Sequence, residues 1–244
     1  MLAGNMLEVI DMYDYEEFCP ISKTASILGE KWTIQIVREM HFGVTRFNDF
    51  MKFMPRLSPT LLNTRLKSLE ECGVIYRRKI HDRKGYEYLL SPSGKSLLPV
   101  IMEMGKWGVS FVFDSLSDNE LNAERLIRDI SLTLDTSALP SGESVIRFKF
   151  TDLEEFSNWY IKIIGEKAEA CEGAPEVEVD VYFTSTLLVF TEIWMGSRGL
   201  KSAIDRGELK VVADPVYTKH LSKWLQLNQY AKFNPKYRTS EVAK

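Results

Sequence analysis

Polar side chains with helical spacing occupy residues 58–72. Leu62, Leu66 and Leu69 recur every three or four positions, so a helix here buries one apolar stripe and turns its other side chains outward. Ser58-Pro59 supplies a good N-cap followed by proline at the first helical position. The outward side chains carry hydroxyl, amide and ammonium groups that can hydrogen-bond phosphates or base edges, and they are Thr60, Asn63, Thr64 and Lys67.

Basic residues gather around this helix. Residues 20–95 contain 14 Lys and Arg against 7 Asp and Glu, a net charge of +7 in a chain whose total is −3. Residues 1–19 and residues 96–244 each carry −5. A basic segment within an acidic protein is typical of a nucleic-acid site. Charge alone also allows a basic face that is merely solvated.

A set of short elements should position these residues. The spacing predicts helices over 22–28, 31–41 and 46–54 before the helix at 58–72, then strands over 74–80 and 86–90 joined by a basic turn. This order describes a winged helix-turn-helix with its recognition helix at 58–72 in the major groove and its wing at 77–86 on the DNA backbone. The candidate DNA contacts are Thr45, Arg46, Ser58, Thr60, Asn63, Thr64, Arg65, Lys67, Arg77, Arg83 and Lys84.

A long helix predicted over 93–113 is apolar nearly all round. Such a helix must be covered on most sides. A second copy of the chain can provide the cover, which favours a homodimer, because helix-turn-helix proteins commonly bind DNA as two-fold dimers. Packing against a second domain is the alternative.

The pattern changes after a polar linker at 114–122, which suggests two domains at 1–118 and 123–230. The second reads as α+β, and we expect the tail after Tyr230 to fray. Its predicted strands are 144–150, 158–164, 168–171, 176–183 and 209–212, and its predicted helices are 187–195, 200–205 and 215–225.

Aromatic and aliphatic side chains are dense in the helix predicted over 187–195. They form a core in the simplest interpretation, because apolar helical stripes usually do. The alternative is an apolar ligand pocket. Its candidate lining residues are Tyr182, Leu187, Phe190 and Trp194.

Catalytic and metal chemistry find little support. The histidines at 41, 81 and 220 are isolated, and Cys19, Cys72 and Cys171 have neither disulfide nor metal spacing. We therefore expect no enzyme, no cofactor and no metal.

The apolar runs are too short to cross a membrane, and the acidic N-terminus lacks a basic leader, so we expect a cytoplasmic protein. Acidic neighbours should raise the pKa of Cys19, which argues against a reactive thiol.

Several motifs together resemble the HxlR family of winged helix-turn-helix regulators. They are Cys19-Pro20, Leu28-Gly29-Glu30-Lys31-Trp32-Thr33, Arg46-Phe47-Asn48-Asp49, Leu57-Ser58-Pro59-Thr60-Leu61-Leu62, Arg65 to Glu70 with Gly73, and Tyr86 to Ser91 with Gly94. The resemblance implies a prokaryotic homodimer that binds a pseudo-palindromic operator in double-stranded DNA. It also implies a redox role for Cys19, since the family often senses electrophiles or oxidants with a cysteine there.

The C-terminal half is similar to sterol-carrier-type lipid-binding domains over 177–184, 187–196 and 203–215. That resemblance implies an apolar small-molecule effector held in a tunnel. We thus expect a dimeric transcriptional regulator that an apolar effector controls. The alternative is a lipid or small-molecule carrier or sensor whose winged helix mediates protein contacts.

Overall fold

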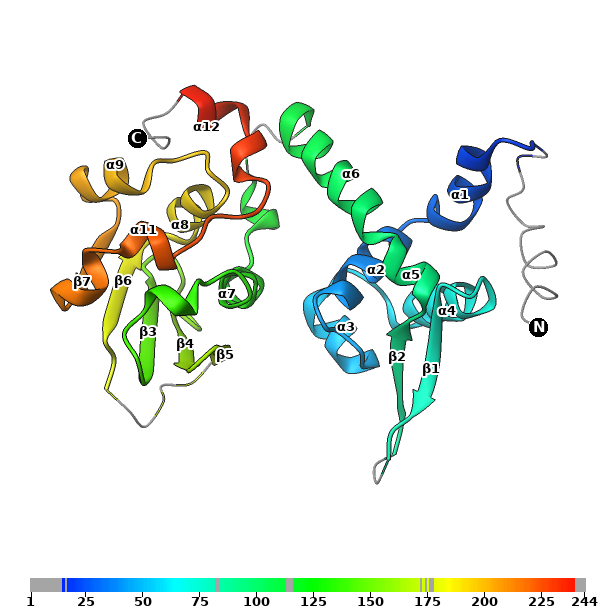
Figure 1. Ribbon diagram of the computed structural model, residues 1–244, viewed down its shortest axis with the longest axis horizontal. Coiled ribbons are helices and arrows are strands. Elements are labelled where there is room, and N and C mark those ends of the chain that lie inside the picture. Colours follow the sequence, from blue (N-terminus) through cyan, green and yellow to red (C-terminus); the bar gives the residue numbers. More distant parts are fainter. Residues whose placement is uncertain are drawn as a thin grey trace. The chain divides into compact units, whose positions relative to one another are not determined.

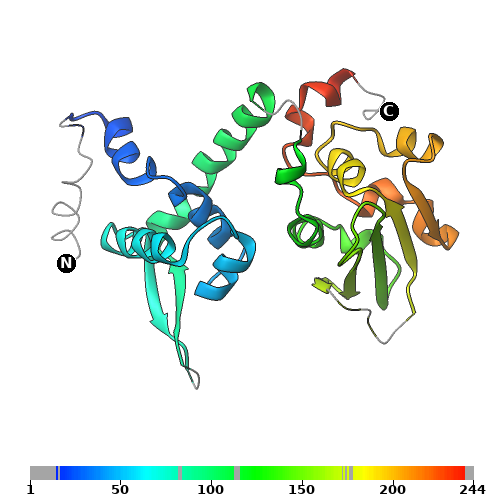
Figure 2. The same cartoon turned by 180° about the vertical axis from the view of Figure 1, so that it is seen from behind.

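The fold divides into two compact units (Figures 1 and 2). A computed structural model describes residues 15, 17–81, 84–112, 116–171, 173, 175 and 178–239. One unit ends at Met104 and the other begins at Gly105, so the division falls inside a helix. No helix within these described ranges is long and apolar enough to cross a membrane. The mixture of helices and sheets confirms the predicted α+β class.

The N-terminal unit is a winged helix-turn-helix, as predicted. Its elements are α1 (Pro20–Leu28), α2 (Thr33–His41), α3 (Phe47–Phe53), α4 (Pro59–Glu71), β1 (Ile75–Lys79) and β2 (Tyr86–Leu90). The two strands form an antiparallel hairpin in which Arg77 lies opposite Tyr88.

One apolar core holds these helices together. Phe50 of α3 and Ile36 of α2 are fully buried beside the inner face of α4. Met54 and Leu57, in the turn between α3 and α4, are also buried. The turn is therefore fixed at both ends, which sets the angle between the two helices.

The long helix predicted over 93–113 is two helices. A turn at Leu97 separates α5 (Pro92–Ser96) from α6 (Leu98–Phe111). Pro99 explains the break, because proline has no N–H to donate and its ring clashes with the carbonyl four residues earlier. Gly94 in α5 lies against the backbone carbonyl of Val74 and leaves no room for a side chain there.

A five-stranded sheet forms the centre of the C-terminal unit. The strands are β3 (Glu143–Phe150), β4 (Asn158–Ile164), β5 (Lys167–Cys171), β6 (Val181–Ser185) and β7 (Lys210–Ala213), in the order β5-β4-β3-β6-β7. β3 and β6 are parallel and the other neighbours are antiparallel. The strand predicted over 176–183 begins only at Val181 among the described residues and ends later, at Ser185, while residues 176 and 177 lie outside the described part.

Helices cover the apolar face of this sheet. α7 (Ala123–Ser131) was missed in the sequence, although Leu126, Ile127 and Ile130 share one face and Asn122 caps it by accepting a hydrogen bond from Arg125 N–H at 2.8 Å. α8 (Leu187–Trp194) brings Phe190 into the same core. The remaining helices are α9 (Leu200–Asp205), α10 (Pro215–Thr218), α11 (Leu221–Trp224) and α12 (Pro235–Thr239).

The segment after α11 is packed as far as the structure describes it, so the predicted fraying after Tyr230 is wrong for residues 231–239, and residues 240–244 lie outside the described part. The Asn228 N–H donates to the Trp194 carbonyl at 2.8 Å, and Asn234 Nδ2 donates to the Met195 carbonyl at 3.4 Å. Both acceptors lie at the end of α8, whose last carbonyls have no helical partner. Ala231 and Asn234 are buried as a result.

Candidate nucleic-acid interface

The inner face of α4 determines what its outer face presents. Leu62, Leu66 and Leu69 are at most 1% exposed, so the helix has one rotational setting on the core. Asn63 and Lys67 then lie on the exposed side. A helix with these properties can place an amide and an ammonium group into a DNA groove.

The beginning of α4 is fixed by its own cap. Ser58 Oγ accepts a hydrogen bond from Leu61 N–H at 3.3 Å, as its place before Pro59 predicts. Thr60 and Thr64 follow on the exposed surface, and the Thr64 hydroxyl donates to the Thr60 carbonyl at 3.0 Å. Each hydroxyl oxygen keeps acceptor capacity toward a ligand.

Arg65 differs from the other predicted contacts on α4. Its guanidinium forms an ion pair with Glu30, and its Nε donates to the Lys31 carbonyl at 3.0 Å. Only 14% of the side chain is exposed. These contacts hold α4 against the turn between α1 and α2, so Arg65 positions the helix rather than presenting a free charge.

The arginines of the hairpin are partly neutralised by acids. Arg77 Nε lies 3.4 Å from Glu70, and its guanidinium is 5.0 Å from the centre of the Tyr86 ring. Arg78 donates to Glu87 at 2.8 Å. Both arginines are more than half exposed, and such exposed pairs are weak, so a phosphate can compete for them. The sequence pattern did not reveal these acidic partners, since Glu70 and Glu87 lie on other elements.

The start of α3 is joined to the wing. Thr45 accepts a hydrogen bond from Tyr88 N–H at 2.7 Å through its carbonyl, and Arg46 pairs with Glu87 in a single backbone bridge. The Arg46 side chain is exposed beside the hairpin. Lys84 is exposed near the tip of the wing, whereas Arg83 lies outside the described residues.

The pKa of the Cys19 thiol differs from the sequence-based expectation. The thiol stands at the N-cap of α1, where hydrogen bonds from the backbone N–H groups of Ser22 and Ile21 lower its pKa. Acidic neighbours were expected to raise the pKa, and that expectation was wrong. By contrast, burial raises the pKa of Cys72.

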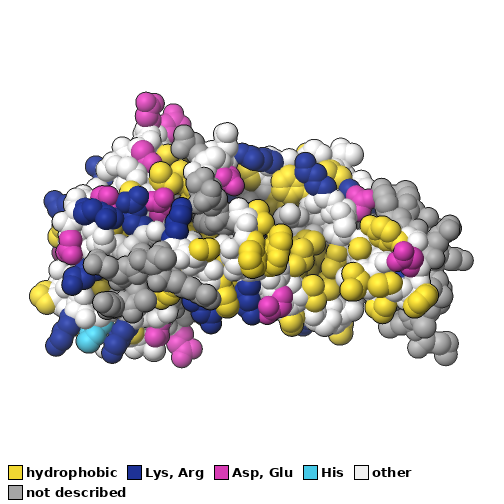
Figure 3. Space-filling model, turned by 90° about the horizontal axis from the view of Figure 1, so that it is seen from above, with side chains coloured by type: hydrophobic (Ala, Val, Ile, Leu, Met, Phe, Trp, Pro, Cys, Tyr) yellow, Lys and Arg dark blue, Asp and Glu magenta, His cyan; other side chains and the backbone are white. Residues whose placement is uncertain are grey.

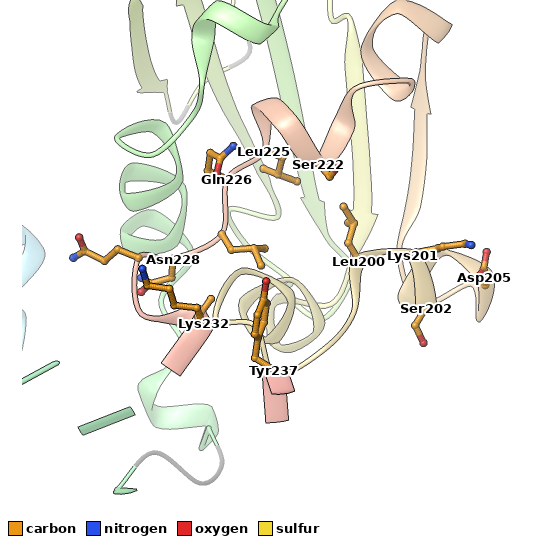
Figure 4. A pocket seen from close by; sticks show the side chains of 13 residues that line it. Leu200, Lys201, Ser202, Asp205, Ser222, Leu225, Gln226, Asn228, Lys232 and Tyr237 are labelled. Atoms are coloured by element: carbon orange, nitrogen blue, oxygen red, sulfur yellow. The ribbon is translucent and has the colours of Figure 1, made fainter. Parts of the chain in front are cut away.

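Three of the four candidate ligand residues of the C-terminal unit lie together in its core, and the fourth faces away from it. Leu187, Phe190 and Trp194 lie in the apolar core. Tyr182 alternates with buried neighbours along β6, so it faces away from that core, and the Arg147 guanidinium lies 5.8 Å from its ring centre. A cavity of about 1050 Å³ opens elsewhere in the unit, between α9, α11 and the segment after α11 (Figure 4).

A metal site in the folded chain would consist of His, Cys, Asp or Glu side chains that lie close together. Within the part of the chain that the structure describes, no three His, Cys, Asp or Glu side chains converge to hold an ion.

Known proteins match the N-terminal part of the chain. Residues 27–115 match the family model described as HxlR-like helix-turn-helix. The uncharacterized HTH-type transcriptional regulator YybR of Bacillus subtilis is 32% identical over 106 residues, which are 43% of this chain and 85% of that protein. The Bacillus subtilis regulator YvaP is 36% identical over 104 residues, which are 42% of this chain and 96% of that protein.

A solved structure, that of the reduced form of the transcriptional regulator YodB from B. subtilis, is 29% identical. The match covers 39% of this chain and 96% of that chain, with a TM-score of 0.35. The family match ends at residue 115, so most of the C-terminal unit lies beyond it.

Proposed function

The chain belongs to the HxlR-like helix-turn-helix family, and from this premise we propose that it is a dimeric DNA-binding transcriptional regulator with a C-terminal sensing unit. One observation carries the proposal. The buried leucines of α4 fix a helix whose exposed side presents Asn63, Thr64 and Lys67. Asn can read adenine with two hydrogen bonds, whereas Lys67 and the hairpin arginines suit phosphates.

An exposed apolar surface on α6 supports the dimer. Met104, Trp107 and Phe111 are 47%, 61% and 77% exposed, and their spacing of three and four residues places them on one side of the helix. Figure 3 shows exposed hydrophobic side chains in the view from above. An exposed apolar patch of this kind marks an interaction site, and a two-fold dimer would place two copies of α4 about one helical turn of DNA apart.

The dimer has a direct test. Replacing Trp107 with Glu adds a charge to the proposed interface, and we expect light scattering to show a shift from dimer to monomer. Val216→Glu, at a half-exposed position in the C-terminal unit, is the control that should stay dimeric. A wild-type monomer at micromolar concentration would contradict this part of the proposal.

The C-terminal unit is proposed to sense a small molecule. The resemblance of its sequence to sterol-carrier-type domains and the cavity in this unit support the role. Effector binding would shift the population of dimer geometries, which requires different affinities for the two geometries. Cys19 is a proposed second input, because a lowered pKa favours the reactive thiolate.

Selection from a random duplex library tests DNA reading and identifies the operator in the same experiment. We expect enrichment of a pseudo-palindrome whose half-sites lie about 10 base pairs apart, as two-fold related helices require. Absence of any enriched motif, together with small-molecule binding, would favour the alternative of a carrier whose winged helix contacts proteins.

A further inference from the structure

The cavity of the C-terminal unit is built by three segments that are distant in sequence. Figure 4 shows Leu200 of α9, Leu225 after α11 and Tyr237 of α12 converging on the same space. The wall that contains Tyr237 is held by the two hydrogen bonds from Asn228 and Asn234 to the end of α8. The packed C-terminal segment, residues 225–237, therefore encloses space that a frayed tail would leave open.

The lining combines an apolar part with a polar, slightly cationic part. Leu200, Leu225 and Leu227 supply the apolar surface. Lys201 and Lys232 supply two positive charges, and Asp205 is the one acid among the described lining residues. The remaining lining groups include hydroxyls and amides, which fix a ligand's orientation through hydrogen bonds. A net charge of +1 beside leucine side chains favours an organic anion with an apolar body.

The same segment contacts α6 on its other side. The Tyr230 ring occupies the place where a side chain at Gly105 would begin, so α6 has no room for one there. Ser110 Oγ donates to the Phe233 carbonyl at 3.2 Å. Lys106 Nζ lies 5.4 Å from the centre of the Phe233 ring. The cavity wall is thus packed directly on α6.

α6 also belongs to the N-terminal unit through Ile101, which is buried in the core that holds α4. A change in the order of residues 225–237 therefore reaches a helix that continues into the DNA-binding unit. Coupling of this kind requires only that one ligand alters the equilibrium of a shared element.

We propose that this cavity binds a small organic anion with an apolar body, and that residues 225–237 transmit its occupancy to α6. The inference deepens the proposed function and rests on it, because it names the chemistry of the effector and the element that reports it. The binding step itself does not depend on DNA.

A matched pair of fluorescent probes tests the anion requirement in the full-length chain. The first probe is 1-anilinonaphthalene-8-sulfonate, and the second is N-phenyl-1-naphthylamine, which is the same molecule without the sulfonate. We expect Lys232→Gln to weaken sulfonate-probe binding about three- to fivefold and Asp205→Asn to strengthen it, as single partly exposed charges do. Binding of the neutral probe should change in neither variant. Equal binding of both probes, or a sulfonate probe indifferent to both substitutions, would overturn the proposed anion site.

Two glycines of α6 test the transmission. Gly105→Ala must displace Tyr230, whereas Gly108→Ala meets no atom of its own chain within 4 Å. With the sulfonate probe bound, we expect amide hydrogen exchange over residues 105–111 to slow in wild type and in Gly108→Ala, but not in Gly105→Ala. An unchanged exchange rate in wild type under saturating probe would refute the transmission.

These readouts need no DNA. A failure of DNA binding in separate experiments would therefore contradict the proposed function alone.

Discussion

α4 and the C-terminal cavity place their polar side chains in different ways. On α4, residues within two turns of one helix share a face because Leu62, Leu66 and Leu69 fix the opposite face. Around the cavity, α9, α11 and residues 225–237 each contribute a few side chains. The first surface depends on local periodicity, whereas the second depends on long-range contacts such as Asn234 with Met195. Single substitutions on α4 and around the cavity should therefore have different effects on DNA binding and on stability.

The largest expected effect is in the hydrophobic core of the C-terminal unit. Phe190 is 1% exposed, with its ring centre 5.1 Å from that of Phe148 and 5.4 Å from that of Phe183. We expect Phe190→Ala to lower the free energy of unfolding of the C-terminal unit by about 3–5 kcal/mol, measured by denaturant titration. Phe156→Ala, at a 65% exposed position, is the control with little change. A Phe190→Ala protein of unchanged stability would mean that this side chain lines a ligand pocket rather than the core.

The next effect concerns base reading by α4. If Asn63 reads a base with two hydrogen bonds, Asn63→Ala should lose about 1–3 kcal/mol of discrimination at one position of each half-site. Binding to duplexes with single base changes measures this loss. Retention of full discrimination at every position by the alanine variant would remove Asn63 from the set of reading residues.

An effect of similar size, on stability rather than on base discrimination, distinguishes positioning from contact within the same helix. Glu30→Gln breaks the pair with Arg65, whose two side chains are both less than one-fifth exposed, and should cost about 1–3 kcal/mol of stability. Glu71→Gln breaks the pair with Lys67, which is 3.6 Å long and exposed, and should cost less than about 1 kcal/mol. The account would be contradicted if Glu30→Gln left thermal stability intact but reduced the salt dependence of DNA binding.

The smallest expected effect is on reactivity alone. Because the pKa of Cys19 is lowered, more of its thiol is ionised at a given pH, so iodoacetamide should alkylate it at a lower pH than an ordinary cysteine. Burial raises the pKa of Cys72, so its reaction should require a higher pH. Variants that keep only one of these cysteines allow each pH profile to be measured by mass spectrometry. The reverse order would contradict the hydrogen bonding at the start of α1.

Local signals in the sequence predict α4 and its surroundings, whereas the long-range contacts of the chain were not predictable. The winged helix-turn-helix was predictable because helix periods, the Ser58 cap and the hairpin pattern are local signals. The break at Leu97 was predictable in principle from Pro99, but the apolar pattern on both sides obscured it. The ion pair between Arg65 and Glu30 was not predictable, because 35 residues separate the partners and no sequence pattern indicates that the two side chains meet.

The C-terminal unit shows the same limit more strongly. Its strands were found by alternation, yet α7 was missed within a polar region. The packed segment after α11 is held by hydrogen bonds from the Asn228 backbone N–H and the Asn234 side chain to backbone carbonyls more than 30 residues away. Every residue type provides a backbone carbonyl, so the sequence pattern could not predict these two hydrogen bonds. The cavity beside the segment that they hold was therefore not predictable either.

DNA reading by α4 is the central claim, and fluorescence anisotropy tests it most directly. The wild-type protein is titrated with a selected duplex and with a scrambled duplex across a range of salt concentrations, beside Lys67→Gln and the control Lys95→Gln. We predict that the selected duplex binds at least about 1,000-fold more tightly. We also predict that log affinity falls linearly with log salt, with a shallower slope in Lys67→Gln only. Equal, weak binding of both duplexes, or the same slope in all three proteins, would contradict the account.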